Sequence, residues 1–309
     1  MKASRSPDLS VNLGGVAMKN PVAVASGTFG YGREYAQLLD ISRLGAVTVK
    51  GLRLAPHAGN PLPRHAEVRG GMVNAVGLQG VGVEAFIQND LPFLREKNVP
   101  VIVNIWGTSG DEYAAVAERL DGVDGVSALE INISCPNVKE GGASFGARVE
   151  TAAALVQKIR ARVKLPLIPK LAPNVPDIRP FARAMEDAGA DAVSLINTIP
   201  AMVINIETRR PVLANRAGGL SGPAIHPVAV KLVYDAAQAV KIPILAMGGV
   251  MEARDAIEFM LAGASAVAVG TANFIDPRTA LRVVDGIAEY MRRHGFASAK
   301  ELTGSVVPP

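Results

Sequence analysis

Cys135 is the only cysteine of this 309-residue chain, and it lies where a side chain could do chemistry. The apolar run 128–133 ends there, and Ser134, Cys135, Pro136 and Asn137 follow it. The thiol of a free cysteine titrates about one to two units above neutral pH, so it can move a proton. An unpaired cysteine is also often a small buried hydrophobe without chemistry. The rest of the chain has to decide between these two interpretations.

Polar or glycine residues occur near or just after the ends of this and seven other apolar runs. They are Ser26-Gly27-Thr28, Lys50-Gly51, Asn104, Asn132, Lys170, Asn197-Thr198, Gly248-Gly249 and Gly270-Thr271. Taken singly, each is most simply a turn residue or a solvated charge. Their recurrence at the ends of successive runs predicts one shared ligand site.

The last two of these positions favour a phosphate. Gly248-Gly249 and Gly270-Thr271 follow the last two of the eight apolar runs. In enzymes built on a (β/α)8 barrel, the loops after the last two strands commonly bind phosphate groups through backbone N–H groups. Glycine lets the backbone approach the anion without a side chain in the way. A dinucleotide fingerprint is absent from the first turn, because Gly30-Tyr31-Gly32 lacks the third glycine at the required spacing.

Two lysines and several asparagines add to this chemistry. Lys50 and Lys170 lie at or near the ends of two apolar runs and are expected to project into the same mouth. A fixed cation there stabilises a reduced flavin or holds a carboxylate. Asn74, from a long Gly- and Asn-containing segment, offers a donor and an acceptor that suit cyclic amides. In the simpler interpretation, Asn74 stabilises its own loop.

Eight short apolar runs, rich in β-branched residues, are expected to be the strands that position these groups. They lie at 22–25, 46–50, 101–105, 128–133, 167–171, 192–196, 244–247 and 266–269. Helical periodicity falls between or after them, at 31–44, 82–97, 111–121, 148–163, 178–188, 227–240, 253–262 and 277–293. This alternation predicts a (β/α)8 TIM barrel with insertions after strands 2 and 6, at 51–81 and 198–226. A doubly wound open sheet is the alternative, and residues 1–309 are expected to form one domain.

Composition excludes several classes of function. Hydrophobic residues make up 49% of the chain, which is enough for a large core. The net charge is only +4 and the sequence has no cluster of Lys and Arg, so nucleic acid is not an expected partner. One cysteine excludes an internal disulfide and an iron–sulfur cluster held by this chain alone. His57, His65, His226 and His294 show no metal-ligand spacing, so no metal site is expected. No apolar run predicts a signal peptide or a membrane span, and the expected location is the cytoplasm.

Several motifs together resemble one known family along almost the whole chain, from Asn20 to about Gly295. They are Ala25-Ser26-Gly27-Thr28, Lys50-Gly51, Gly59-Asn60-Pro61-Leu62-Pro63-Arg64, Asn74-Ala75-Val76-Gly77-Leu78, Asn132-Ile133-Ser134-Cys135-Pro136-Asn137, Met247-Gly248-Gly249-Val250 and Val269-Gly270-Thr271. The chain resembles the catalytic subunit of class 1 dihydroorotate dehydrogenase, a flavoprotein oxidoreductase of pyrimidine biosynthesis. The resemblance implies an FMN-containing (β/α)8 barrel, one FMN per chain.

Details of the motifs point to a subclass. The chain resembles class 1 in having cysteine at position 135, because the membrane-associated class has serine there. The run Asn137-Val138-Lys139-Glu140-Gly141-Gly142, with Lys50-Gly51, resembles subclass 1B. That subclass implies a homodimeric core flanked by two electron-transfer subunits, which carry FAD and a [2Fe–2S] cluster and pass electrons to NAD+. Subclass 1A, which reduces fumarate without such a partner, is the alternative.

The resemblance also implies roles for individual residues. Cys135 removes a proton from C5 of dihydroorotate while a hydride passes from C6 to N5 of FMN. The substrate residues are Lys50, Asn74, Ala75, Val76, Gly77, Leu78, Asn132, Asn197 and Thr198. The FMN residues are Ser26, Lys50, Gly51, Asn104, Asn132, Lys170, Ile196, Gly222, Gly248, Gly249, Gly270 and Thr271. The segment 136–146 is expected to close over the substrate and exclude water.

Three other functions stay open at this point. One is a related FMN barrel that acts on another pyrimidine, such as dihydropyrimidine dehydrogenase. A second is a phosphate-binding barrel without redox chemistry, such as a sugar-phosphate lyase or isomerase, which would be colourless where a flavoprotein is yellow. A third is a non-catalytic binding module, which the crowded strand ends disfavour.

Overall fold

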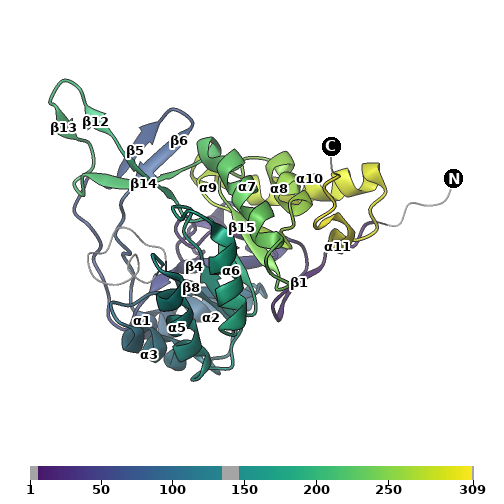
Figure 1. The fold of residues 1–309 in the computed structure, drawn as a ribbon, viewed down its shortest axis with the longest axis horizontal. Helices are drawn as coiled ribbons and strands as arrows, with labels where there is room; N and C mark the ends of the chain where they lie inside the picture. The colour runs from purple at the N-terminus through teal and green to yellow at the C-terminus, as the bar shows by residue number, and fades with distance from the viewer. Residues whose placement is uncertain (1–5, 134–145, 308–309) are drawn as a thin grey trace.

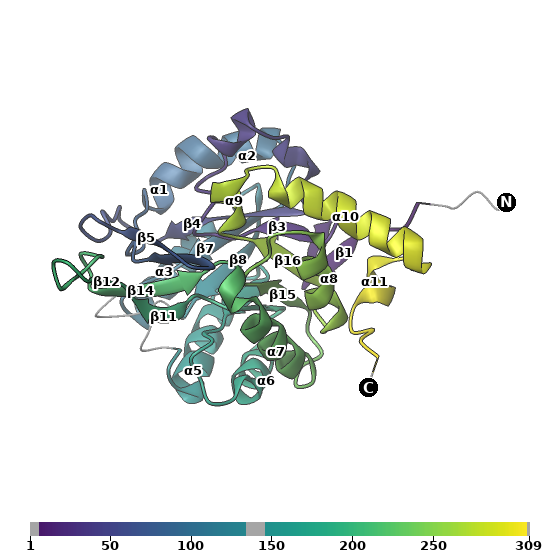
Figure 2. The same ribbon diagram turned by 90° about the horizontal axis from the view of Figure 1, so that it is seen from above.

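The computed structural model describes residues 6–133 and 146–307, and a closed barrel of parallel strands lies at its centre (Figures 1 and 2). Its strands are β3 (Val22–Val24), β4 (Ala46–Leu52), β7 (Val101–Ile105), β8 (Val126–Asn132), β9 (Leu167–Lys170), β10 (Val193–Leu195), β15 (Ile244–Met247) and β16 (Ala266–Val269). Each pairs in parallel with its neighbours, and β16 closes the barrel against β3. This topology confirms the predicted (β/α)8 barrel.

Helices surround the barrel, as the view from above shows (Figure 2). The longer ones are α3 (Gly110–Leu120), α5 (Val149–Arg160), α6 (Ile178–Asp187), α7 (His226–Ala237), α8 (Ala253–Leu261) and α10 (Thr279–His294). Between the second and third barrel strands, β4 and β7, the helical layer is made of α1 (Val83–Ala85), the π-helical η3 (Phe86–Asp90) and α2 (Leu91–Glu96). Short helices are η1 (Tyr35–Gln37), η2 (Ile41–Arg43), η4 (Pro223–Ile225), α9 (Ala272–Ile275) and α11 (Ala299–Leu302).

Local sequence explains where several helices begin and end. The Ser109 side chain accepts a hydrogen bond from the backbone N–H of Glu112 at the start of α3. Asp177 caps α6 in the same way, and α10 ends at Gly295 in the left-handed conformation.

The predicted helix at 31–44 is wrong. Only the 3-10 turns η1 and η2 form there. Gly30 and Gly32 have φ values of 57° and 86°, which break the helical backbone, and Asp40 caps only the short turn that follows it.

The barrel strands read as continuous apolar runs because both of their faces are covered. Side chains such as Val47, Val103 and Leu129 point outward and pack in one core with the helices. Alternate side chains, such as Ala128 and Ile168, point inward and form a second core.

An N-terminal hairpin closes one end of this inner core. It consists of β1 (Val11–Leu13) and β2 (Val16–Met18), which pair antiparallel. Its apolar side chains pack with inward residues of the barrel strands, at the end where those strands begin. The sequence analysis did not anticipate this hairpin.

The two insertions meet in a second sheet that projects from the barrel (Figure 1). It consists of β5 (His65–Val68), β6 (Gly71–Asn74), β11 (Ile199–Met202) and β14 (Ala217–Ser221), in the order β11-β14-β6-β5. A small hairpin, β12 (Ile204–Asn205) with β13 (Arg210–Pro211), extends beyond it. The insertions after strands 2 and 6 were predicted, but their pairing into one sheet was not.

No helix in the described part of the chain, residues 6–133 and 146–307, is long and apolar enough to cross a membrane.

Candidate functional site

A cavity lies at the carboxyl ends of the barrel strands, beside the sheet formed by the insertions. It is lined by Ala25, Ser26, Gly27, Thr28, Lys50, Gly51, His65, Met72, Asn74, Val76, Gly77, Leu78, Asn104, Asn132, Lys170, Ile196, Asn197, Thr198, Ser221, Gly222, Ile225, Met247, Gly248, Gly249, Gly270, Thr271 and Phe274. This is the face on which barrel enzymes build their active sites.

The structure brings almost all of the predicted site residues to this cavity. Every residue predicted to hold FMN lines it, and so does every predicted substrate residue except Ala75. The Ala75 side chain is 1% exposed and packs with Ala66, Val73 and Leu213 in the small core of the second sheet. The cavity shows that these residues lie together, whereas their individual roles stay predictions.

Cys135 and the segment around it are a different case. Residues 134–145 lie outside the described residues, so the predicted base and the predicted closing segment have no described geometry. The described chain reaches Ile133, which is buried directly after β8.

A buried carboxylate that the sequence analysis missed organises the floor of the cavity. Glu130 on β8 is fully buried, and its Oε2 accepts a 2.7 Å hydrogen bond from Nδ2 of Asn104. Its Oε1 accepts a 2.9 Å bond from Oγ of Ser194 on β10. A buried charge needs such partners, because an unpaired one is strongly unfavourable.

Lys170 completes this network from β9. Its Nζ lies 3.9 Å from Oε2 of Glu130, and the side chain is 8% exposed. Asn104, Glu130, Lys170 and Ser194 thus come from four neighbouring strands. The sequence signal for Glu130 was a charged residue two positions before Asn132 in an apolar run, which places both side chains on the inner face.

Asn132 presents an acceptor that the described chain does not satisfy. Its Oδ1 is buried and has no hydrogen-bond partner among residues 6–133 and 146–307. The hydroxyl of Tyr113 on α3 donates a 2.6 Å bond to the Asn132 carbonyl oxygen and fixes the end of β8. A buried acceptor that faces a cavity indicates a ligand with a hydrogen-bond donor.

The glycine turns form a cradle with little side-chain bulk. Gly248 and Gly249 have φ values of 132° and 75°, which only glycine adopts readily. A Cβ atom at Gly249 would lie 2.9 Å from the carbonyl oxygen of Gly222. Beside this turn, Oγ1 of Thr271 donates a 2.7 Å bond to Oγ of Ser221. Such a backbone-lined concavity fits a phosphate group.

One wall of the cavity carries the ammonium group of Lys50, on the barrel strand β4. Burial, followed by the charge of Arg64, lowers the pKa of Lys50, and Glu34 partly opposes this shift. Burial, Arg64 and Lys50 lower the pKa of His65, another lining residue. A partly desolvated ammonium group such as that of Lys50 favours an anionic ligand, whereas the lowered pKa of His65 favours its neutral imidazole.

Other lining residues carried no sequence signal of their own. His65, Met72 and Ser221 reach the cavity because β5, β6 and β14 pair with each other, with Gly219 opposite Asn74 and Ser221 opposite Met72. Phe274 comes from the short helix α9 after the last strand.

Comparison with known proteins gives the same family as the sequence motifs. The family model described as dihydroorotate dehydrogenase matches residues 8–291. A relative from Geotalea uraniireducens, named "Dihydroorotate dehydrogenase B (NAD(+)), catalytic subunit", is 54% identical over 97% of this chain and 99% of its own length. A protein of the same name from Geobacter sulfurreducens is 52% identical over 98% of this chain and 99% of its own.

Solved structures agree on the fold. The crystal structure of dihydroorotate dehydrogenase from Eimeria tenella in complex with ferulenol superposes with a TM-score of 0.83. It is 23% identical and covers 98% of this chain and 90% of that chain. The named relatives confirm the resemblance to subclass 1B that the motifs indicated. With the barrel, the cavity and these matches taken together, the chain belongs to the dihydroorotate dehydrogenase family.

Proposed function

We propose that this chain oxidises dihydroorotate to orotate in pyrimidine biosynthesis, with FMN in the cavity at the mouth of the barrel and Cys135 as the base. Its membership of the dihydroorotate dehydrogenase family supports the reaction. The observation that carries the site assignment is the convergence of the predicted FMN residues, and of all predicted substrate residues but Ala75, on one cavity.

The residues of the cavity fit FMN at both of its ends. The backbone cradle of Gly222, Gly248, Gly249 and Gly270 would hold the phosphate, together with Thr271. Asn104, Asn132 and Lys170, on the barrel floor, would hold the flavin ring, and the unsatisfied Oδ1 of Asn132 suits a ring N–H. When bound, FMN supplies the hydride acceptor. The Lys170 ammonium would stabilise the negative charge of the reduced ring.

The substrate would lie in the part of the cavity next to the second sheet. Dihydroorotate is a cyclic imide with a carboxylate, and the Lys50 ammonium would bind that carboxylate. Asn74 and Asn197, each with a donor and an acceptor, would bind the ring amides, with Thr198 beside them. Asn74 is held in place because its Nδ2 donates a 3.3 Å bond to the Gly219 carbonyl oxygen on the neighbouring strand.

Cys135 would remove the proton from C5 of the substrate. It follows the buried end of β8 by three residues, and β8 carries Asn132 at the same mouth. A thiolate is a suitable base near neutral pH, and the segment that follows would exclude water from it.

The electrons would leave through a second protein. The names of the relatives, with NAD(+) and a catalytic subunit, support NAD+ as the acceptor and a partner subunit. We further propose that this partner carries FAD and a [2Fe–2S] cluster, since one cysteine cannot ligate such a cluster. The proposed assembly is a homodimeric core of single-domain chains flanked by two partners, in the cytoplasm.

The role of Cys135 is tested by Cys135→Ser. A general base contributes about 10²–10⁴-fold, so turnover at neutral pH should fall by that factor while FMN stays bound, as its visible absorbance reports. The residual activity should rise at higher pH, because a hydroxyl is harder to deprotonate than a thiol. Stopped-flow reduction of the flavin by dihydroorotate isolates this step from later electron transfer. Near-normal flavin reduction at neutral pH would refute the assignment.

The acceptor is tested with the purified chain, alone and with its partner subunit. Dihydroorotate oxidation should reduce NAD+ only in the complex, and fumarate should not replace NAD+. Fumarate reduction by the chain alone would assign it to subclass 1A. A colourless protein that does not bind FMN would contradict the flavin site.

A further inference from the structure

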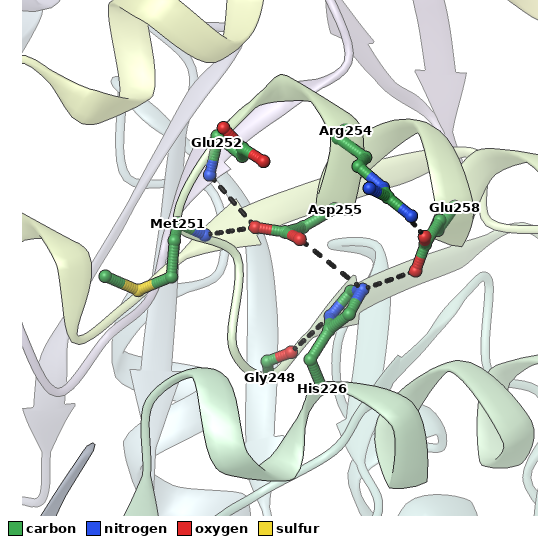
Figure 3. Close-up of polar contacts among 7 residues, drawn as sticks. All are labelled: His226, Gly248, Met251, Glu252, Arg254, Asp255 and Glu258. Carbon is green, nitrogen blue, oxygen red and sulfur yellow. Dashed lines mark hydrogen bonds and ion pairs between the residues drawn. The ribbon is translucent and has the colours of Figure 1, made fainter. Parts of the chain in front are cut away.

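His226 is a buried histidine that lies directly behind the cavity and not on its wall. It is the first residue of α7 and is 8% exposed. Figure 3 shows its ring between the carbonyl of Gly248 and the side chains of α8. Its Nδ1 lies 3.0 Å from the Gly248 carbonyl oxygen, and its Nε2 lies 3.0 Å from Oε2 of Glu258. The edge-on ring of Phe259 closes the site.

The backbone of His226 also supports the glycine turn. A Cβ atom at Gly249 would lie 2.7 Å from Cβ of His226 and 3.0 Å from its backbone nitrogen. A Cβ atom at Gly248 would lie 2.9 Å from Cβ of Ala229, one turn further along α7. The Gly248-Gly249 turn after β15 therefore lies directly against the first turn of α7. The imidazole of His226 connects these two segments, which are far apart in the sequence.

Both partners of the ring are hydrogen-bond acceptors. A carbonyl oxygen and a carboxylate oxygen offer no proton of their own, so a hydrogen bond to either one uses a proton on the ring nitrogen that faces it. The other charged groups around it come from α8: Asp255, whose Oδ1 is 3.9 Å from Nε2, and Arg254, which pairs with Glu258 at 3.4 Å.

We propose that His226 is a positioning residue for the phosphate end of FMN. It donates from Nδ1 to the Gly248 carbonyl and from Nε2 to Glu258, and so anchors the Gly248-Gly249 turn to α7 and α8. The inference rests on the proposed FMN site and deepens it, because it assigns the rigidity of the phosphate cradle to a residue outside the cavity. A turn that is fixed before binding loses less conformational entropy when the anion arrives.

Two substitutions of His226 separate its two hydrogen bonds. Asn places an amide N–H near the position of Nδ1, so His226→Asn keeps the bond to Gly248 and loses the bond to Glu258. Gln places its amide near Nε2, so His226→Gln keeps only the contact with Glu258. FMN affinity of the flavin-free full chain, measured by fluorescence quenching, should fall about tenfold in His226→Gln, since one lost hydrogen bond is about a factor of ten. It should stay within about threefold of the wild type in His226→Asn.

Riboflavin provides the second readout, because it has the same ring as FMN but no phosphate. Its affinity should be equal in the wild type, His226→Asn and His226→Gln if the residue acts on the phosphate cradle. His294→Gln is the matched control, since it makes the same change in an exposed histidine of α10 that stacks on Tyr290. It should leave the affinities for both flavins unchanged.

The outcomes separate this inference from the proposed function. If the wild type binds FMN but His226→Gln binds it equally well, the inference is wrong and the FMN site stands. If riboflavin affinity falls as much as FMN affinity, His226 supports the fold and not the phosphate cradle. If the wild type binds neither flavin, the proposed function itself fails.

Discussion

The two ends of the barrel interior lie on the same strands and have opposite chemistry. Near the amino ends, inward side chains such as Ile102, Ala128 and Ile168 form an apolar layer with the N-terminal hairpin. Two residues further along β7, β8 and β9, the inward side chains are Asn104, Glu130 and Lys170. Residues two apart on a strand point to the same side. Moving two residues along each strand therefore leads from the apolar core to the polar floor of the site.

This difference separates stabilisation from function. The lower layer buries apolar groups that need no partners, so its contribution to the free energy of unfolding depends on packing alone. The upper layer buries a carboxylate, an ammonium group and amides that are favourable only while they satisfy each other. Its orientation is therefore fixed before a ligand arrives, which is what a catalytic site requires. The comparison leads to three predictions, in order of decreasing effect.

The largest effect is expected from removing the central carboxylate of the upper layer. Glu130→Leu leaves the Lys170 ammonium buried without its counter-ion and Asn104 without its acceptor. The free energy of unfolding of the flavin-free protein should fall by about 3–5 kcal/mol. Urea unfolding, followed by circular dichroism, measures it, and Glu130→Gln is the milder variant if Glu130→Leu does not fold.

The control for this prediction removes both charges. The double variant Glu130→Leu/Lys170→Met should recover most of the stability, because a paired apolar replacement leaves no buried charge. Glu150→Leu, on the exposed face of α5, should change stability by less than about 0.5 kcal/mol. If the single and double variants were equally stable, the ion pair would have no part in the upper layer.

A smaller effect on stability, with none on chemistry, is expected in the lower layer. Ile168→Ala removes buried methyl groups two residues before Lys170, which should cost about 2–5 kcal/mol of unfolding free energy. Turnover and FMN affinity should stay within twofold of the wild type at a temperature where the variant is folded. A loss of turnover in the fully folded variant would show that the two layers are not separable.

The smallest effect concerns the charge of Lys50. Burial and then Arg64 lower its pKa, so the charged form opposes folding at neutral pH. Lys50→Met should raise the stability of the flavin-free protein at pH 7 by less than about 1 kcal/mol, because solvent screens the partly exposed ammonium group, and it should weaken dihydroorotate binding.

The sign of the pH dependence follows from proton binding. Above the lowered pKa of the folded state, the unfolded chain binds more protons at Lys50, so the wild type gains stability as pH rises toward about 10.4. The difference between Lys50→Met and the wild type should therefore shrink over that range. Lys300→Met, a substitution of an exposed lysine on α11, is the control and should show no such trend in thermal unfolding. If the stability difference between Lys50→Met and the wild type stayed constant with pH, its assignment to the titration of Lys50 would be wrong.

Much of the fold could be predicted from the sequence because its main signal is local. Runs such as 101–105 and 244–247 coincide with β7 and β15, since strands covered on both faces have to be apolar throughout. The segment 31–44 failed, because its apolar spacing resembles a helix while Gly30 and Gly32 take left-handed backbone angles. Periodicity does not reveal such angles.

The residues of the site likewise fall into those that the sequence revealed and those that it did not. Lys50, Asn132 and Gly248 could be found from the sequence, because each lies at the end of an apolar run and strand ends converge on one face of a barrel. Glu130 was missed although it lies in the same run as Asn132. Its role depends on Asn104, Lys170 and Ser194, and nothing in the spacing of those residues shows that their side chains meet.

The sequence by itself therefore determined the barrel, the face that carries the site and most of the residues that line the cavity. These features follow from the local alternation of apolar and polar residues along single strands. Only the tertiary structure decided which side chains pair, how the two insertions join in one sheet, and that His226 reaches the turn at Gly248. The reason is physical: hydrogen bonds and ion pairs act over a few ångströms in space, and the closing of the barrel, not separation along the chain, sets those distances.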